Sequence, residues 1–361
     1  MPAITSTPQY LLASNLSAVY IKTQETLGAF DNPCPALDPG PGYDGTNAIR
    51  VVGTPTFAVR GAGIIQRADV MTPWGGNQSS KTGGLGWDIT LTTELFWELG
   101  TAFDVTLATA TQLAPLFLAS PWAIKNSGGD TNLEVQPFFY ASETRSGETP
   151  INFAVQPFSI VYEETGGKRF EAYDCVAIPK LSWEYGQKIS IEWTIKGKWL
   201  AVTDSTGVTP TYVAAATEPP LVGVNCNLSL SGYFDNVNAV SKVTIDTGWA
   251  INDVADFRET YGFGLGFINL AASPSIEVDV ADIAEGNEPD WTEAQANTIF
   301  GGPLTLVLTV GSYAITFTLS NPQPANFPTP GELNSYRTNT VKFQGIPGSA
   351  TSVMTWNFEG A

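Results

Sequence analysis

Three groups of neighbouring carboxylates have the residue types that acid–base chemistry needs. They are Glu163 with Glu164, Glu277 with Asp279, and Asp282 with Glu285. Two carboxyl groups can hydrolyse a glycosidic bond, one as the acid and the other as base or nucleophile. Acidic residues that alternate with apolar ones are, however, typical of the solvent face of a half-exposed strand. We therefore interpret all three groups as solvent-facing and predict no catalytic residue.

Two further patterns bear on ligand binding. The stretch Asp279–Asp290 is rich in oxygen ligands, but it lacks the alternating acidic positions and closing Glu of a recognisable Ca²⁺ loop. The glycines at 83–86 and 262–266 lead into predicted strands, whereas a phosphate-binding loop leads from a strand into a helix N-terminus. We interpret them as turn or close-packing glycines, and predict neither a metal nor a cofactor.

The composition excludes several classes of protein. The chain has 361 residues, and its 17 Lys and Arg against 35 Asp and Glu give a net charge of −18. That excess argues against a reader of nucleic acid or a protein that docks on anionic lipid, because both depend on basic residues. Histidine is absent, which removes the commonest general base and the commonest metal ligand. The apolar fraction of 43% is sufficient for a folded core.

Targeting signals are also missing from the sequence pattern. The N-terminal stretch has no basic region followed by an apolar core, and no apolar run reaches the roughly 18 residues of a membrane span. The three cysteines, Cys34, Cys175 and Cys226, are too widely spaced for a disulfide framework. We expect a soluble chain that is made in a cytoplasm and is not inserted into a membrane.

Alternation of apolar and polar residues is the dominant pattern, and it predicts a mainly β fold. The clearest alternating stretches are 88–95, 188–196, 275–280, 305–310 and 313–319. The dipeptide Gly311-Ser312 between the last two predicts a hairpin. Trp193 and Phe343 lie on apolar strand faces, so we expect them in the core.

Helical signals are few. Residues 109–118 begin with Thr and have near-helical apolar spacing, although Pro115 interrupts them. Residues 290–300 have Asp290 as an N-cap candidate, Glu293 three residues later, and Gly301 as a stop. We predict one short helix in each half of the chain.

The chain divides at a polar and Pro-containing stretch. Residues 204–220 are a predicted linker between a first unit, 1–203, and a second unit, 221–361. The first unit contains a Pro- and Gly-rich loop at 28–47 and a predicted insertion at about 120–155.

The two units show a weak internal duplication. The segments that correspond are 84–89 with 264–268, the helix near 110–118 with that near 292–300, 166–172 with 311–316, and 188–198 with 339–345. Their order and element type agree, so we predict two tandem units of one kind.

Aromatic residues in loop-like segments have no evident reason to be buried. They are Phe30, Tyr43, Trp74, Trp122, Phe138, Phe139 and Tyr140. Exposed aromatic side chains either anchor subunit contacts or stack on sugar rings. We predict that these seven are subunit contacts, with carbohydrate binding as the alternative.

Two runs resemble the major tail tube proteins of siphophages. They are Arg67–Gly76 (RADVMTPWGG) and Thr82–Leu95 (TGGLGWDITLTTEL), which are followed by the predicted short helix. The resemblance covers residues 65–200 and, through the duplication, 240–361 more loosely. It implies β-sandwich or barrel units, each with a flanking helix, whose inner sheets close a barrel around a channel.

The same resemblance implies a virion structural protein without enzymatic activity. Its rings would stack into a hollow tail tube through which the DNA passes without specific binding during ejection. Chains with one unit form hexameric rings, so a duplicated chain would form a ring from three subunits. The partners implied are copies of the chain, a tape-measure protein and other tail proteins.

Two other classes of function remain open from the sequence. The chain could be a carbohydrate-binding β-sandwich of a tail tip or capsid surface, which needs exposed aromatics converging on one groove. It could also be a hydrolase that uses two carboxylates. Quaternary state separates these classes, because a tube protein must polymerise whereas a binding module or enzyme can act as a monomer.

Overall fold

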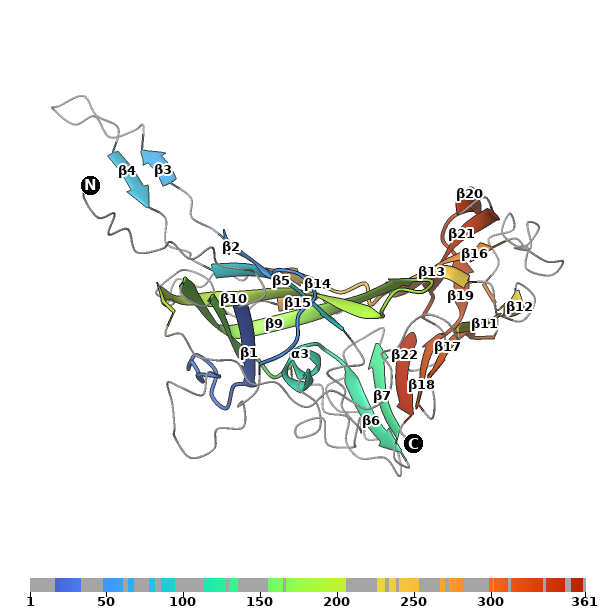
Figure 1. The fold of residues 1–361 in the computed structure, drawn as a ribbon, viewed down its shortest axis with the longest axis horizontal. Coiled ribbons are helices and arrows are strands. Elements are labelled where there is room, and N and C mark those ends of the chain that lie inside the picture. The colour runs from blue at the N-terminus through green and yellow to red at the C-terminus, as the bar shows by residue number, and fades with distance from the viewer. Residues whose placement is uncertain are drawn as a thin grey trace, which may run out of the picture.

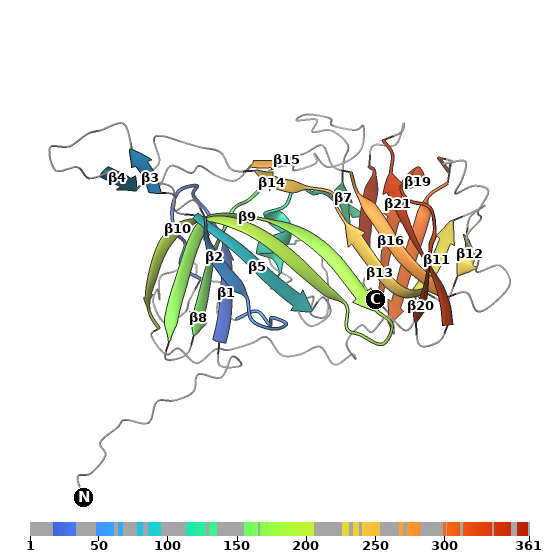
Figure 2. The same ribbon diagram turned by 90° about the horizontal axis from the view of Figure 1, so that it is seen from above.

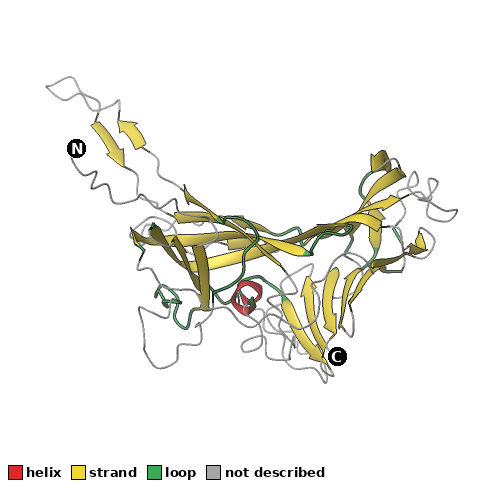
Figure 3. Ribbon diagram, in the orientation of Figure 1, coloured by secondary structure: helices red, strands yellow, loops and turns green. Residues whose placement is uncertain are grey.

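The computed structural model describes most of the chain in segments. They are residues 17–33, 48–60, 64–67, 78–81, 86–94, 113–127, 130–135, 155–164, 167–205, 226–230, 234–237, 240–252, 267–269, 273–281, 299–300, 302–310, 313–333, 336–347 and 352–359. Within these residues the protein is mainly β, with two large antiparallel sheets and one short helix (Figure 3). The mainly β prediction is confirmed.

The large sheet has 11 strands. Its members are β1 (Ser17–Thr23), β2 (Thr56–Arg60), β5 (Gly86–Glu94), β8 (Phe158–Glu164), β9 (Lys168–Glu184), β10 (Ser190–Asp204), β13 (Val240–Asp246), β16 (Ser275–Ala281), β19 (Pro322–Pro324), β20 (Thr329–Leu333) and β21 (Tyr336–Gly345). A second sheet has seven strands. Its members are β6 (Ala123–Ser127), β7 (Asp130–Val135), β11 (Cys226–Leu230), β12 (Phe234–Val237), β17 (Leu304–Val310), β18 (Tyr313–Leu319) and β22 (Met354–Glu359).

The remaining elements are small. Two hairpin-like pairs stand apart from the large sheets, β3 (Ile64–Arg67) with β4 (Gln78–Lys81) and β14 (Ala250–Asn252) with β15 (Phe267–Asn269). The helix is α3 (Ala114–Leu118). In Figures 1 and 2 the pair β3–β4 projects away from the rest of the molecule.

The large sheet runs across the whole molecule. In the view of Figure 1, α3 and the β1 end of this sheet lie below its long strands in the first half, and the seven-stranded sheet lies below them in the second half. The alternating stretches of the sequence form strands as predicted, including the β17–β18 hairpin. Trp193 and Phe343 are fully buried between the layers, so their predicted core positions are confirmed.

The helix predicted at 109–118 is described from Leu113 onward. It begins at Ala114, so Pro115 lies in its first turn instead of interrupting it. Proline is tolerated there because the first N–H groups of a helix have no intrahelical partner. Residues 109–112 and 290–298 are outside the described part of the chain, and Ile299 and Phe300 are not helical.

The same order of strand pairing occurs twice. In the first half, β1 pairs with β8, β8 with the start of β9, and that start with the end of β10. In the second half, β11, β17, β18 and β22 pair in this order. A second set of four strand segments also recurs, and both copies lie in the large sheet. In the first half the order is the end of β9, β10, β5 and β2. In the second half the corresponding order is β19 with β20, β21, β16 and β13.

Each half contains a bend where strands pass from one layer to the other. Among the described residues, positive φ outside glycine occurs only at Asp174 (49°) and Asn321 (44°). Asp174 is at the bend of β9, and Asn321 separates β18 from β19, so the two residues occupy corresponding places. Asn and Asp tolerate this conformation better than other residues with a Cβ atom.

At each bend a glycine lies in close contact with a residue of a neighbouring segment. A Cβ atom on Gly197 would lie 2.5 Å from Sγ of Cys175, and one on Gly345 would lie 2.5 Å from Cγ1 of Val353. These contacts are too close for a side chain, so the two glycines permit the strands to approach each other.

Substitution of Gly197 by alanine is therefore expected to destabilise the protein. The added methyl group must displace the buried Cys175 side chain, which we expect to lower the free energy of unfolding by about 1–3 kcal/mol. Gly302→Ala is the matched control, because a Cβ atom at Gly302 meets nothing within 4 Å. Urea denaturation compares the two variants. Equal midpoints would show that the structure accommodates a methyl group at Gly197 without loss of stability.

The predicted insertion has a defined role in the fold. β6 and β7 lie within it, and β7 pairs with β22, so strands of the first half extend the sheet of the second (Figure 1). The predicted correspondence of 84–89 with 264–268 is wrong. β15 pairs with β14 in a separate small sheet, whereas the strand that corresponds to β5 by pairing is β16. The glycines at 264–266 are outside the described residues.

The predicted linker is described at its start only. β10 continues to Asp204, and residues 206–220 lie outside the described part of the chain. The boundaries of the two units stay predictions.

Candidate functional site

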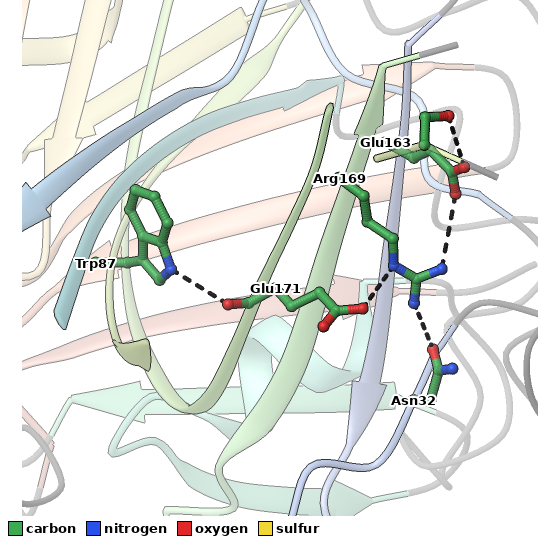
Figure 4. A network of polar contacts seen from close by, with 6 residues as sticks. Asn32, Trp87, Glu163, Arg169 and Glu171 are labelled. Atoms are coloured by element: carbon green, nitrogen blue, oxygen red, sulfur yellow. Dashed lines mark hydrogen bonds and ion pairs between the residues drawn. The ribbon is translucent and has the colours of Figure 1, made fainter. Parts of the chain in front are cut away.

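An ion cluster is buried between the N-terminal segment and the β8–β9 hairpin (Figure 4). Nε of Arg169 donates to Oε1 of Glu171 at 2.6 Å, and Nη1 lies 3.9 Å from Oε2 of Glu163. Nη2 donates to Oδ1 of Asn32 at 3.2 Å, and Oγ of Ser205 donates to Oε1 of Glu163 at 2.8 Å.

The geometry of this cluster is that of a structural clamp. The side chains of Arg169 and Glu163 are 1% and 3% exposed, so neither carboxylate nor guanidinium is presented to solvent. The backbone oxygen of Glu171 also accepts from Nε1 of Trp87 at 3.2 Å. The solvent-facing interpretation of Glu163 is thus wrong, because its carboxylate is buried against Arg169.

A second polar cluster fixes the bend of β9. Oδ1 of Asp174 accepts from Nε2 of Gln24 at 3.0 Å and from the backbone N–H of Gly28 at 2.9 Å. Oδ2 of Asp174 lies 2.9 Å from Nζ of Lys198. The N–H of Asp174 donates to Oε1 of Gln24 at 2.6 Å. The side-chain amide of Gln24 therefore hydrogen-bonds both the carboxylate and the backbone N–H of Asp174. These contacts attach residues 24–28 to the large sheet.

Cys175 lies beside this cluster and is fully buried. Burial, and secondarily the carboxylate of Asp174, raises the pKa of its thiol well above the ordinary value of 9.0. Since the thiolate is the reactive form, this thiol is expected to be inert in the folded protein.

Alkylation measures that expectation directly. We expect iodoacetamide at pH 8 to leave the Cys175 peptide unmodified in the native protein, and to modify it fully in denaturant, as read by mass spectrometry. Rapid native-state modification would contradict the buried, protonated thiol.

Of the remaining two carboxylate pairs, the structure describes one. Glu277 and Asp279 lie on β16 with half-buried side chains, and Oγ1 of Thr340 donates to Oδ1 of Asp279. Asp282 and Glu285 are outside the described residues. Within the segments that the structure describes, no group of three or more His, Cys, Asp or Glu side chains could hold a metal ion.

The structure places two of the seven aromatic subunit-contact candidates. Trp122 is 1% exposed, and its ring centroid lies 4.8 Å from that of Trp249 and 5.0 Å from that of Trp356. The expectation that Trp122 is exposed is wrong, because the two tryptophans of the second half cover it. Phe30 is half-buried against a small cluster that includes Tyr20. Tyr43, Trp74, Phe138, Phe139 and Tyr140 lie outside the described residues.

The features best placed for a function are two strand edges of the large sheet. β2 pairs only with β5 among the described strands, and β20 pairs only with β21. The two strands are at opposite ends of the sheet (Figure 2). An unpaired edge presents a row of backbone N–H and C=O groups that can pair with another chain.

Exposed apolar side chains occur at or near these edges. Val59 in β2 is 48% exposed, Val52 before it is 51% exposed, and Phe327 before β20 is 55% exposed. Sequence reasoning missed Val52 and Val59 because it looked only at aromatic residues, and it missed Phe327 because it had not identified the neighbouring strand β20. The signal that could have found β20 is its sequence Thr329-Pro330-Gly331-Glu332, since proline within a strand is typical of an edge.

Comparison with known proteins adds no relative to this picture. Protein-family models give no match to the chain, and a search of the curated proteins gives none either. The one helix in the described segments is too short to cross a membrane.

Proposed function

We propose that this protein is a structural subunit that assembles with its own copies into rings, and that the rings stack into the hollow tail tube of a phage. The observation that carries the proposal is the large sheet, which repeats one order of pairing and ends in two edges that no further described strand pairs with. A sheet of this kind can join head to tail with further copies, and closure into a ring leaves no open edge.

The repeated pairing supports two tail-tube-like units in one chain. Each half has four strands in one layer and four strand segments in the other, in matching order. Because the resemblance to tail tube proteins implies rings of six units, two units per chain correspond to three chains per ring.

The charge is consistent with a channel for nucleic acid. A net charge of −18 per chain, repeated around each ring and along a stack, would repel the phosphates of passing DNA instead of binding them. The proposed partners are copies of the chain, a tape-measure protein and other tail proteins, and the proposed location is the virion tail. No enzymatic activity is part of the proposal.

Electron microscopy of the purified protein, with sedimentation velocity on the same sample, tests the proposal. We expect rings or tubes with a central hole, and threefold symmetry if each chain holds two units. Sixfold symmetry would refute the two-unit arrangement but keep the tube. A monomer that persists at high concentration would refute assembly, and a glycan-binding screen would then test the carbohydrate-binding alternative.

A further inference from the structure

We propose that β2 of one chain pairs antiparallel with β20 of the next copy, with Phe57 opposite Pro330 and Ala58 opposite Thr329. This inference rests on the proposed ring assembly and specifies which edges form the contact and in which register. It is argued from a junction that already exists inside the chain.

The internal junction joins the two halves of the large sheet. β13, the first strand of the second half in this sheet, pairs with the end of β9 in the first half. In that ladder Ile245 lies opposite Leu181, and Asp246 lies opposite Lys180. The end of β9 is thus the edge of the first half that pairs with the second half, and β13 is the edge of the second half that pairs with the first. Each of these two edges has a counterpart at one end of the large sheet.

Pairing registers identify β2 as the counterpart of β13. In the first half, Phe57 lies opposite Ile89, and Ile89 lies opposite Ile195. In the second half, Ile245 lies opposite Ile276, and Ile276 lies opposite Phe343. Phe57, Ile89 and Ile195 therefore form a row of neighbours across three strands, and Ile245, Ile276 and Phe343 form the corresponding row. Phe57 thus occupies the position of Ile245.

The same rows identify β20 as the counterpart of the end of β9. Ile195 and Phe343 correspond, and five residues before each of them are Ser190 and Thr338. Ser190 lies opposite Ser182 of β9, and Thr338 lies opposite Gly331 of β20. Gly331 thus corresponds to Ser182, so Pro330 corresponds to Leu181 and Thr329 to Lys180.

The residues of β13 are more buried than their counterparts on β2, as expected if β2 lacks the neighbouring strand that β13 has. Ile245 of the internal junction is 0% exposed, and Thr247, which directly follows β13, is 1% exposed. Their counterparts on β2 are Phe57, which is half-buried, and Val59, which is 48% exposed. A strand laid against β2 would cover these side chains as β9 covers β13.

The backbone of β20 favours β2 as its partner over a second β20. The N–H of Tyr185 donates to the carbonyl of Ser241, so alternate residues of β9 back to Leu181 direct their N–H groups toward β13. Pro330 takes the place of Leu181 and has no N–H to offer. Phe57 can donate to the carbonyl of Pro330, whereas two β20 strands facing each other would each lack that donor.

Disulfide cross-linking in the full chain tests the register. We expect the double variant Ala58→Cys with Thr329→Cys to form interchain disulfides on oxidation, giving a ladder of linked chains on a non-reducing gel. Asp246→Cys with Lys180→Cys is the matched control, because these positions are the internal counterparts and lie opposite each other within one chain. The parent chain, with its natural cysteines, gives the background.

Two further variants fix the interpretation. Thr54→Cys with Thr329→Cys moves the first cysteine four residues back along the chain, to a position before β2, and should not cross-link above background. Val59→Glu should raise the concentration needed for assembly at least tenfold, whereas Tyr185→Glu, at a side chain 66% exposed in the turn after β9, should leave it unchanged.

The outcomes separate this inference from the proposed function. Assembly that is indifferent to Val59→Glu, or rings in which Ala58→Cys and Thr329→Cys stay unlinked while the internal control links, would overturn the edge pairing and leave the ring standing. Equal cross-linking by the offset pair would overturn the register. A protein that never assembles would overturn both.

Discussion

Replacing Trp122 with alanine is expected to lower the free energy of unfolding by about 3–5 kcal/mol. The indole lies in the core, in edge-to-face geometry with the ring of Trp249 and tilted against the ring of Trp356, both from the second half of the chain. Removing it leaves a large cavity where the two halves meet. We therefore expect a lower urea midpoint and a shallower transition, because loosened halves unfold less cooperatively.

Trp122→Phe is the matched variant for this prediction. Nε1 of Trp122 has no hydrogen-bond partner among the described residues, so phenylalanine sacrifices packing area but no hydrogen bond. We expect it to retain most of the stability. Tyr185→Ala, at an exposed position, controls for the removal of an aromatic side chain. A Trp122→Ala protein as stable as Tyr185→Ala would refute the role of Trp122 as a core residue.

Replacing Arg169 with methionine is expected to cost a similar amount, about 3–5 kcal/mol. Methionine can fill much of the space, but Glu163 and Glu171 would lose the cation that compensates their burial. Lys242→Met is the matched control. Its partner Glu184 lies 3.7 Å away with both side chains about half exposed, and such pairs contribute at most about 1 kcal/mol.

A second substitution shows where the cost arises. If the stranded carboxylate is the cause, adding Glu163→Gln to Arg169→Met should restore part of the lost stability, because the buried charge is removed. Purely additive losses in chemical denaturation would instead attribute the effect to packing.

Local patterns predicted the strands well where a strand buries one face and exposes part of the other. The stretch 188–196 alternates so regularly that the burial of Ile191, Trp193 and Ile195 follows from period alone. The β17–β18 hairpin could be predicted for the same reason, together with its two-residue turn.

Properties that depend on distant contacts were not predictable. Trp122 looks like a loop residue, and only the placement of Trp249 and Trp356 shows that it is buried. In the sequence, Arg169 and Glu163 are typical of an exposed, charged hairpin. Their burial depends on contacts with Asn32 and Ser205, which are distant in the chain. The repeat was misaligned at Gly264 because a glycine motif is a weaker guide to correspondence than the register of paired strands.

The crossing of β6 and β7 from the first half onto the sheet of the second has a mechanical consequence. The halves are joined by two separate backbone ladders, β9 with β13 and β7 with β22, in addition to the covalent connection. A protease that cut the chain between Ser205 and Cys226 would thus leave two fragments clasped together. Tension along the molecule would be carried by these hydrogen-bonded strands.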